Sequence, residues 1–395
     1  MAIRHTAARR KTSGNDYFTG LIALLICICA AVSIGLVILN LVNMGFPLTT
    51  MPFLLIVIAD IALVVLAFYL VLSGKAVYRV SARIGCFALA ALLIFLNLFM
   101  SSNLSVTDDF LNKQYDESQG DASYSGAAPR SPGASVDITK PFSIYVSGAD
   151  NSGDINQAGR SDVNMLIFVD PAHYKILLIN TPRDYYVRLH GTTGYLDKLT
   201  HAGVYGIDMS EETLQDLYSF NIDYHVRVNF DTLPKLVDAM GGIVVDNPTA
   251  FNLWGNSFAE GEIYLDGGYA LLYCRERDDL AAGDNDRGAN QQRVIEAIIS
   301  RVTKPNVVVH YKDIIQALSG SFRSNIPPAV ITQLFGRQIS LGGHWTIEKL
   351  AAIGTNSKQP TYTMGDKPLD VIIPDQNSVD EISAAIHNFL TQLTQ

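Results

Sequence analysis

The sequence predicts an α/β (α+β) fold, with a mixed central sheet sandwiched by helices and preceded by three transmembrane helices. Beyond residue 140, short apolar runs rich in β-branched residues alternate with helix-like segments, which is typical of mixed sheet-and-helix domains. Three long apolar stretches fall within the first hundred residues. The whole chain has a hydrophobic content of 48% and a mean hydropathy of +0.19, which is high for a wholly soluble protein, and the excess lies in these first hundred residues.

The three apolar stretches cover residues 18–42, 53–72 and 84–100. The first two are long enough to cross a bilayer as helices, and the third is near the lower limit. Three buried core helices are the alternative, but such helices need polar faces, which these stretches lack. Asp60 lies inside the second stretch, where we expect a neutral acid hydrogen-bonded to a neighbouring helix rather than a functional carboxylate.

Basic residues predict the orientation of these helices. Four precede the first stretch, three lie between the second and third, and residues 43–52 contain none. The positive-inside rule therefore places residues 1–17 in the cytoplasm, residues 18–100 in the cell membrane and the remainder outside. Residues 101–140, rich in Ser, Gly, Ala, Asp and Pro, are predicted to form a flexible extracellular linker. Residues 141–395 form the predicted extracellular domain.

Charge and cysteine content narrow the possible partners of this domain. Residues 1–100 carry 7 Lys and Arg and 2 Asp and Glu, a net charge of +5, whereas the other 22 basic and 36 acidic residues give −14. A domain this acidic is a poor nucleic-acid binder. Cys274 is the only cysteine beyond residue 100. It lies in an apolar run, where a small buried residue is favoured over a nucleophile with a paired base.

The extracellular domain begins with three strand-like runs, at residues 142–146, 163–169 and 174–180. Residues 185–189, 224–230 and 243–246 are further candidate strands. Asp208 and Glu211 resemble a capping box for a helix that ends near Phe220, and Asp231 is placed to cap a helix that ends at Gly241. Further helices are predicted at residues 267–275, 287–301, 311–318, 328–340 and 380–392. The sequence contains no Rossmann glycine fingerprint, P-loop or Cys/His metal spacing.

The stretch from Tyr273 to Arg293 contains four arginines, at positions 275, 277, 287 and 293. A short acidic loop separates the two pairs, and apolar helical runs flank it, so two buried elements would deliver guanidinium groups to one place. Guanidinium suits phosphate because its planar fork donates two parallel hydrogen bonds and keeps its charge. A solvated, salt-bridged loop is the alternative interpretation.

Polar side chains also cluster at the ends of the predicted strands. Asp150 follows the first strand, Arg160 and Asp162 precede the second, and Arg183 follows the third. Residues at strand ends can converge on one edge of a sheet. Two carboxylates together with phosphate oxygens would suit Mg²⁺ or Mn²⁺, although turn formation is a common alternative role for Asp. Arg183 could instead pair with the neighbouring Asp184.

In this order, these motifs resemble the LytR-CpsA-Psr family. The resemblance covers roughly residues 142–299 and includes Asp197-Lys198-Leu199-Thr200-His201-Ala202. The closing signature reads Arg275, Arg277, Gly283, Asp284, Arg287 and Gln291. Two positions depart from the family pattern: Asp286 stands where a glycine is usual, and Asn290 where an arginine is usual. Both departures could weaken or reshape a phosphate clamp.

The resemblance implies a membrane-anchored phosphotransferase that moves a glycopolymer from a polyprenyl-pyrophosphate lipid to a hydroxyl of peptidoglycan. It implies a catalytic group of Asp150, Asp162, Arg183, Arg275 and Arg277, with Asp150 and Asp162 binding Mg²⁺ (or Mn²⁺). It further implies substrate-binding roles for Arg160, Lys198, Asp284, Arg287 and Gln291, of which Lys198 is a weaker candidate. His201 is left out as a candidate core histidine. A polyprenyl-pyrophosphate hydrolase and a non-catalytic lipid- or wall-binding regulator remain the alternatives.

Overall fold

In the computed structural model, the chain divides into two compact units, Met1–Val106 and Thr107–Gln395. The described residues all belong to the second unit: 138–149, 155, 157–229, 231–276, 284–304, 321–327, 343–391 and single residues between 311 and 342. The three predicted membrane stretches, Asp60 and most of the predicted linker lie outside them. Within the described part of the chain, no helix is both long enough and apolar enough to span a membrane.

A six-stranded sheet forms the centre of the described unit, with strand order β11-β6-β1-β2-β3-β12. The strands are β1 (Phe142–Ala149), β2 (Ser161–Asp170), β3 (Lys175–Asn180), β6 (Tyr224–Asn229), β11 (Phe322–Ser324) and β12 (Thr346–Ala351). Strand β1 runs parallel to β6 and antiparallel to β2, while β3 runs antiparallel to β2 and parallel to β12. The predicted mixed central sheet is therefore confirmed.

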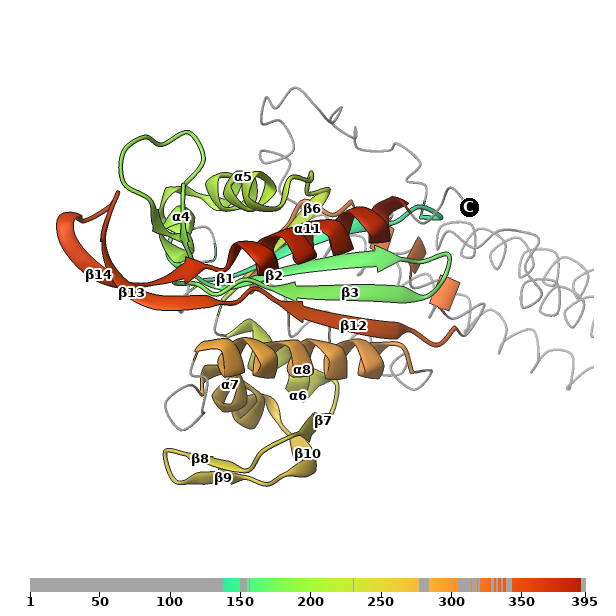
Figure 1. The fold of residues 1–395 in the computed structure, drawn as a ribbon. Coiled ribbons are helices and arrows are strands. Elements are labelled where there is room, and N and C mark those ends of the chain that lie inside the picture. Colours follow the sequence, from blue (N-terminus) through green and yellow to red (C-terminus); the bar gives the residue numbers. More distant parts are fainter. Residues whose placement is uncertain are drawn as a thin grey trace, which may run out of the picture. The chain divides into compact units, whose positions relative to one another are not determined.

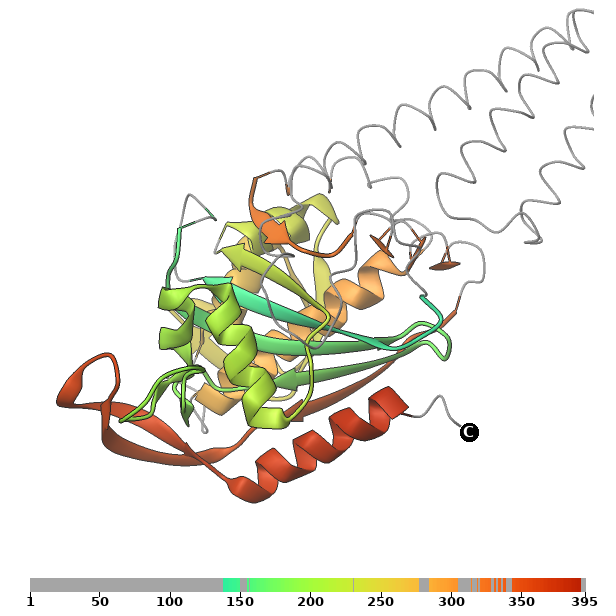
Figure 2. The ribbon, with the colours of Figure 1, turned by 90° about the horizontal axis from the view of Figure 1, so that it is seen from above.

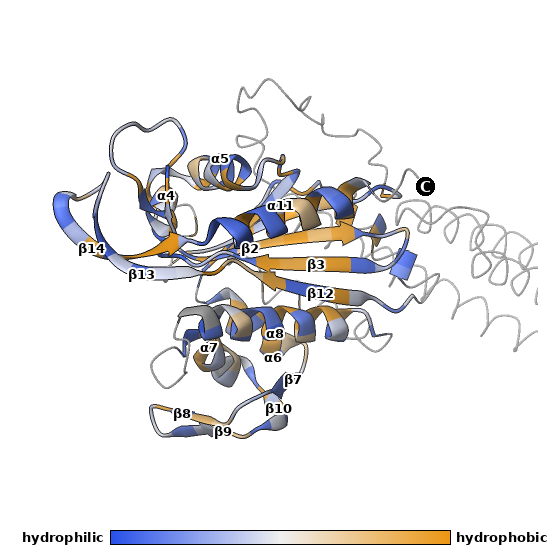
Figure 3. Cartoon of the chain, viewed as in Figure 1, coloured by the Kyte–Doolittle hydropathy of each residue, from blue (hydrophilic) through white to orange (hydrophobic). Residues whose placement is uncertain are grey.

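Helices cover both faces of this sheet because its inner strands are apolar on both sides (Figures 1 and 3). On one face, Leu166 and Phe168 pack with residues of α5 (Ile207–Tyr218) and α11 (Gln376–Thr391). On the other face, Met165 and Val169 lie in the cluster that includes residues of α8 (Asp284–Val302). Figure 2 shows α5 and α11 crossing the same side of the sheet. This arrangement is the predicted sandwich.

A further layer lies on the far side of α8 (Figure 1). It contains α6 (Thr232–Ala239), α7 (Gly267–Arg275), β7 (Ile243–Asn247), β8 (Phe251–Leu253), β9 (Asn256–Phe258) and β10 (Gly261–Leu265). Val237, Ala270 and Tyr273 pack there with Val294 of α8 in one hydrophobic cluster. Helix α8 is thus buried between two cores.

A long hairpin, β13 (Gly354–Thr361) and β14 (Gly365–Pro374), extends past one edge of the central sheet in both ribbon views (Figures 1 and 2). Its outer part is largely polar (Figure 3). It contacts the short pair β4 (Tyr186–Val187) and β5 (Asp197–Lys198), which precedes α4 (Leu199–Tyr205). The Tyr186 hydroxyl, for example, donates a hydrogen bond of 2.7 Å to the carbonyl of Pro360.

Most of the sequence-predicted elements are confirmed within two or three residues. Helix α7 has the predicted bounds, whereas α8 begins three residues earlier and α11 four residues earlier than expected. The strand expected at residues 185–189 is reduced to the two residues of β4. Helix α4, strands β5 and β8–β12, and the β13–β14 hairpin were not predicted. The helices expected at residues 311–318 and 328–340 are described only at isolated positions.

Candidate functional site

Several strand ends meet at one edge of the central sheet. Ala149, at the end of β1, pairs with Ser161 at the start of β2 and with Asn229 at the end of β6. Asn180, at the end of β3, pairs with Met165 of β2 and with Ala351 at the end of β12. The expected convergence of strand ends is confirmed, and it brings the chain around Asp162 close to the chain around Arg183.

Asp162 and Arg183 form the central contact of this edge. Arg183 Nη1 donates to Asp162 Oδ2 at 2.8 Å, and both side chains are largely buried. Thr200 donates its hydroxyl proton to Asp162 Oδ1 at 3.3 Å. Asp162 lies within strand β2, so it is not a turn-forming residue. Arg183 Nε lies 3.8 Å from Asp184 Oδ2, so of these two carboxylates Asp162 is the closer to Arg183.

A buried polar cluster fixes the start of β2 beneath Asp162. The Ser161 hydroxyl lies 3.0 Å from the Tyr145 hydroxyl and 2.9 Å from the Ser147 hydroxyl, and it donates to Asn164 Oδ1 at 2.9 Å. Tyr145 also donates to Asn164 Oδ1 at 2.7 Å, and burial raises the pKa of Tyr145 so that it stays a neutral donor. Satisfied buried polar groups specify one arrangement, because leaving one unpaired is unfavourable.

Helix α4 packs against the same edge. A Cβ added at Gly203 would lie 2.6 Å from the carbonyl oxygen of Gly159 and 2.9 Å from the amide nitrogen of Ser161. Only a glycine therefore permits this approach of α4 to β2. The amide of Thr200 donates to the Arg183 carbonyl at 2.8 Å. Helix α4 thus holds the Thr200 hydroxyl against Asp162.

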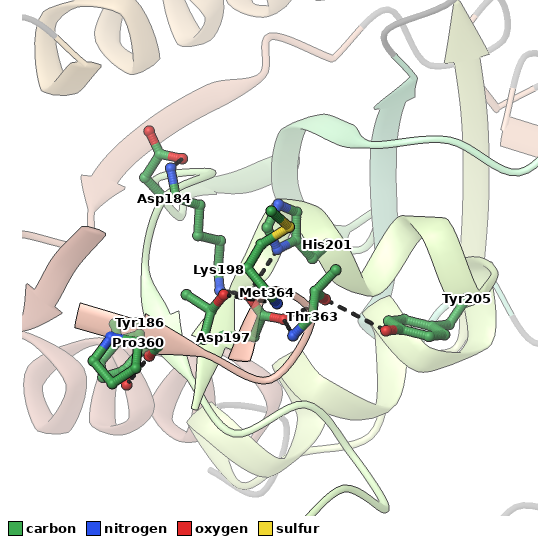
Figure 4. A network of polar contacts seen from close by, with 10 residues as sticks. Asp184, Tyr186, Asp197, Lys198, His201, Tyr205, Pro360, Thr363 and Met364 are labelled. Carbon is green, nitrogen blue, oxygen red and sulfur yellow. Dashed lines mark hydrogen bonds and ion pairs between the residues drawn. The ribbon is translucent and has the colours of Figure 1, made fainter. Parts of the chain in front are cut away.

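Lys198 and Asp197 extend the site toward the β13–β14 hairpin (Figure 4). Lys198 Nζ donates to Asp184 Oδ1 at 2.9 Å. Asp197, which is fully buried, accepts from His201 Nδ1 at 2.7 Å and from the Thr363 amide at 2.8 Å. Burial opposes ionisation of Asp197, but the bonds from His201 and Thr363 outweigh it and lower the pKa of Asp197. His201 is thus a buried, hydrogen-bonded histidine, which agrees with the prediction that it is a core residue.

We expect Asp197→Asn to destabilise the domain by about 1–3 kcal/mol at neutral pH, because the bonds to His201 and Thr363 lose their charged acceptor. A carboxylate whose pKa is lowered by folding stabilises the protein above its unfolded pKa, and this stabilisation is lost as the pH falls through the lower folded value. The difference from wild type should therefore shrink below pH 3.8, the ordinary pKa of Asp.

Thermal unfolding of the full chain between about pH 2 and pH 7 measures this difference, across the ordinary carboxyl range. Asp366→Asn is the matched control, since Asp366 accepts a bond from the exposed Tyr195 hydroxyl. A gap between wild type and Asp197→Asn that stays constant down to the lowest pH would contradict the assigned role of the charge.

The predicted arginine stretch reaches the site edge from the other face of the sheet. Gly288 of α8 lies so close to Asn180 that an added Cβ would come within 2.1 Å of the side-chain Nδ2 of Asn180. Its neighbour Arg287 is buried, whereas Arg275 is exposed at the end of α7. The Arg275 guanidinium lies 5.8 Å from the centre of the Trp254 ring. Arg160, at the start of β2, is exposed.

Two amide side chains fasten α8 to α7. Gln291 Nε2 donates to the Cys274 carbonyl at 3.4 Å, and Asn290 Nδ2 donates to the Tyr273 carbonyl at 3.2 Å. Asn290 Oδ1 also accepts a bond of 2.7 Å from Arg293. Gln291, a predicted substrate-binding residue, thus contacts a backbone carbonyl at the end of α7. Burial raises the pKa of the Cys274 thiol to about 12, which agrees with the prediction that it is not a nucleophile.

Asp150, Arg277 and the side chain of Asp284 lie outside the described residues. Within the described ranges, no group of three or more His, Cys, Asp or Glu side chains is arranged to hold a metal ion. Asp162 and Thr200 do offer carboxylate and hydroxyl oxygens, the hard donors that Mg²⁺ prefers. They fit a role as part of a metal site whose other oxygens come from elsewhere.

The LytR_cpsA_psr family matches residues 104–384, which is most of the chain and includes every candidate site residue. The chain belongs to this family. The resemblance read from the motifs at Asp150, Asp162, Arg183 and Arg275 is therefore confirmed.

Two curated relatives carry names that describe an activity. The chain is 33% identical over 194 residues to the polyisoprenyl-teichoic acid–peptidoglycan teichoic acid transferase TagU of Bacillus mycoides. The matched region covers 49% of this chain and 63% of that protein. It is 35% identical over 189 residues to the protein of the same name from Enterococcus faecalis, and this match covers 47% of this chain and 62% of that protein. The chain thus matches less than two thirds of each relative's length.

Solved structures of the family share the fold. The structure of B. subtilis TagV has a TM-score of 0.54 and 28% identity, and covers 64% of this chain and 98% of that one. Protein gbs0355 from Streptococcus agalactiae has a TM-score of 0.53 and 27% identity, with 64% and 88% covered. The mixed sheet with its covering helices is thus the fold of this family.

The two departures from the family motif have identifiable surroundings in this chain. Asn290 is buried and makes the contacts to Tyr273 and Arg293 described above, so it joins helices without adding a charge. Asp286 is the third residue of α8, where a carboxylate favourably meets the positive end of the helix dipole. The sequence did not single out Thr200 or Trp254. Thr200 was inside a recognised motif, whereas nothing near Trp254 in the sequence indicates its contact with Arg275.

Proposed function

We propose that this protein transfers a glycopolymer from a polyprenyl-pyrophosphate carrier to peptidoglycan. Family membership and the names of its relatives in Bacillus mycoides and Enterococcus faecalis support this function. The observation that carries it is the Asp162–Arg183 pair, a carboxylate and a guanidinium held together at an edge where several strand ends meet. Phosphoryl transfer needs such groups because its catalysis depends on positioning and on neutralising phosphate oxygens.

In the proposed reaction, an acceptor hydroxyl oxygen of peptidoglycan attacks the phosphorus that bears the polymer. The bond from that phosphorus to the bridging oxygen breaks, the hydroxyl releases its proton to the solvent, and polyprenyl phosphate leaves with the bridging oxygen. Arg183 binds the pyrophosphate and stabilises the charge that develops on the leaving phosphate. Arg275 and Arg277 bind the pyrophosphate beside it. Arg160, Lys198, Asp284, Arg287 and Gln291 support the substrate around them.

The deciding experiment incubates the full chain in detergent with a synthetic polyprenyl-pyrophosphate glycopolymer, with and without peptidoglycan. It measures polymer attached to peptidoglycan and polyprenyl phosphate released. Polymer attached to peptidoglycan, with release of polyprenyl phosphate that depends on the acceptor, is the expected result. Equal release without an acceptor would indicate the hydrolase instead. No release under either condition would leave the non-catalytic lipid- or wall-binding regulator.

We assign the proposed Mg²⁺ or Mn²⁺ to Asp150 and Asp162, together with pyrophosphate oxygens. When bound, the ion would supply positive charge to the phosphate oxygens. Excess chelator is expected to abolish transfer, and Mg²⁺ to restore it. Asp162→Asn should lower Mg²⁺ affinity by at least about tenfold in a titration with the lipid analogue, since a ligand loses its charge. Undiminished transfer in chelator would overturn the metal assignment.

We also propose that residues 18–100 form three membrane helices, with residues 1–17 in the cytoplasm and the family domain outside. The Lys and Arg distribution of the first hundred residues supports this topology. Ser123→Cys, in the proposed linker, should react with an impermeant thiol reagent on intact cells after the wall is made permeable. Arg10→Cys, in the proposed cytoplasmic segment, should react only after lysis. Protection of the Ser123→Cys variant until lysis would reverse the topology.

A further inference from the structure

A cluster of half-exposed apolar side chains lies beside the candidate site. We call it the tyrosine patch, and it consists of Tyr195, Val204, Tyr205, Tyr362 and Met364, each between 44% and 48% exposed. Its residues come from the loop before β5, the end of α4 and the turn of the β13–β14 hairpin. Two chain segments that are distant in sequence, residues 195–205 and the hairpin turn, therefore contribute to the patch, which is unlike a single exposed residue on a helix.

Hydrogen bonds hold the polar ends of these tyrosines against the protein. The Tyr205 hydroxyl lies 3.4 Å from the Thr363 hydroxyl, and the Tyr195 hydroxyl donates to Asp366 at 2.6 Å. The Tyr205 and Tyr362 rings are 6.4 Å apart and inclined at 59°. Fixing the hydroxyls limits rotation of the rings, so the exposed apolar surface has a defined shape with polar groups at its border.

The tyrosine patch is coupled to the candidate site through Asp197 (Figure 4). Thr363, between Tyr362 and Met364, donates from its amide and from its hydroxyl to Asp197. The next residue, Lys198, bonds Asp184, the neighbour of Arg183. The same buried carboxylate thus sets the position of the hairpin turn and of the β5 strand that carries Lys198.

The charges of the hairpin favour a sugar polymer over a lipid surface as the partner of this patch. Residues 354–374 contain two lysines and two aspartates, and so have no basic excess. Surfaces that bind anionic membranes are instead rich in Lys and Arg. A sugar ring has an apolar C–H face and hydroxyls at its edge, which match aromatic faces bordered by a carboxylate such as Asp366.

We propose that the tyrosine patch binds the glycan strand of the acceptor, next to the pyrophosphate site. The inference rests on the proposed transferase function, which needs a second polymer close to the reacting phosphate. Sugar rings of the strand lie against Tyr205 and Tyr362, and hydroxyls at the ring edges reach the polar border. Binding of the strand to the tyrosine patch would hold one of its hydroxyls near the pyrophosphate, although the patch itself does not contact the reacting atoms.

Binding of purified, uncross-linked peptidoglycan glycan strands to the full chain in detergent tests this directly, without any turnover. Tyr205→Ser and Tyr362→Ser should each raise Kd by roughly three- to tenfold, the range expected for losing one aromatic contact. Tyr205→Phe should bind almost as the wild type does, because it keeps the ring. Tyr264→Ser is the matched control, since Tyr264 is an exposed tyrosine of β10 in the outer layer.

Wild-type glycan affinity in the Tyr205→Ser, Tyr362→Ser double variant would overturn the proposal. So would an unchanged glycan affinity combined with weaker binding to anionic phospholipid vesicles, which would make the patch a membrane contact. Thermal unfolding of the variants shows whether they are folded. If wild type binds glycan through the patch but transfers no polymer, the proposed function fails while the binding surface stands. If it does transfer polymer, the variants should raise the KM for the acceptor.

Discussion

Arg183→Ala is expected to lower polymer transfer by about one to two decades. The lost charge-assisted hydrogen bond is worth roughly 1.5–3 kcal/mol, and a tenfold change in rate corresponds to about 1.4 kcal/mol. The effect has two sources in this structure. The substitution removes a guanidinium that would bind the pyrophosphate, and it also removes the 2.8 Å partner of Asp162. Asp162 would then keep only the weaker, 3.3 Å bond from Thr200 among the contacts described for the pair.

Two variants make this result specific. Arg183→Lys keeps the charge but loses the planar fork, so we expect it to recover only part of the rate. Arg188→Ala removes a nearby arginine whose guanidinium bonds the carbonyls of Thr192 and Gly194 on the exposed side of the loop, and its transfer rate should be unchanged. Transfer and thermal unfolding are measured for all three variants in parallel. A wild-type rate for Arg183→Ala would remove the pair from the reaction and contradict the proposed mechanism.

The sequence predicted a sheet covered by helices because the strands of the sheet are apolar on both faces and so need a covering layer on each. Residues 163–169 and 176–180 pack against α5 and α11 on one side and α8 on the other, so continuous apolar runs marked them clearly. The β13–β14 hairpin was missed for the opposite reason. Gly354–Thr361 is mostly polar and partly exposed, so its residue types do not indicate a strand. It is a strand because it pairs with β14.

The arrangement of the candidate site was predictable where motif residues lie at strand ends, and less predictable where it depends on tertiary packing. The closeness of Asp162 and Arg183 was expected because strand ends converge at one edge of the sheet. The pairing of Arg183 with Asp162 rather than mainly with Asp184 depends on how β2 and β3 are registered, which no local pattern encodes. The contact of Gln291 with the Cys274 carbonyl was similarly not predicted, because the approach of α7 to α8 is a tertiary feature. The substrate-binding role of Gln291 stays a prediction.

Gly203→Ala is expected to destabilise the protein by about 1–3 kcal/mol, the usual range for overpacking a well-filled contact. The added Cβ would meet backbone atoms, the Gly159 oxygen at 2.6 Å and the Ser161 nitrogen at 2.9 Å, which cannot rotate away as a side chain could. Relief requires α4 to move from β2. Such a movement would carry the Thr200 hydroxyl away from Asp162, so transfer should fall together with stability.

Gly268→Ala is the matched control for Gly203→Ala, since both glycines lie in helices. A Cβ at Gly268 would meet only the Asp266 carboxylate oxygen, at 3.5 Å, within ordinary contact distance. Alanine is also the better helix former, so this variant should be at least as stable as wild type. Thermal unfolding and the transfer rate at a temperature well below the unfolding midpoint are measured for both variants. If Gly203→Ala unfolds like wild type, α4 does not depend on that close approach. If it is destabilised but transfers polymer normally, the position of Thr200 does not matter to the reaction.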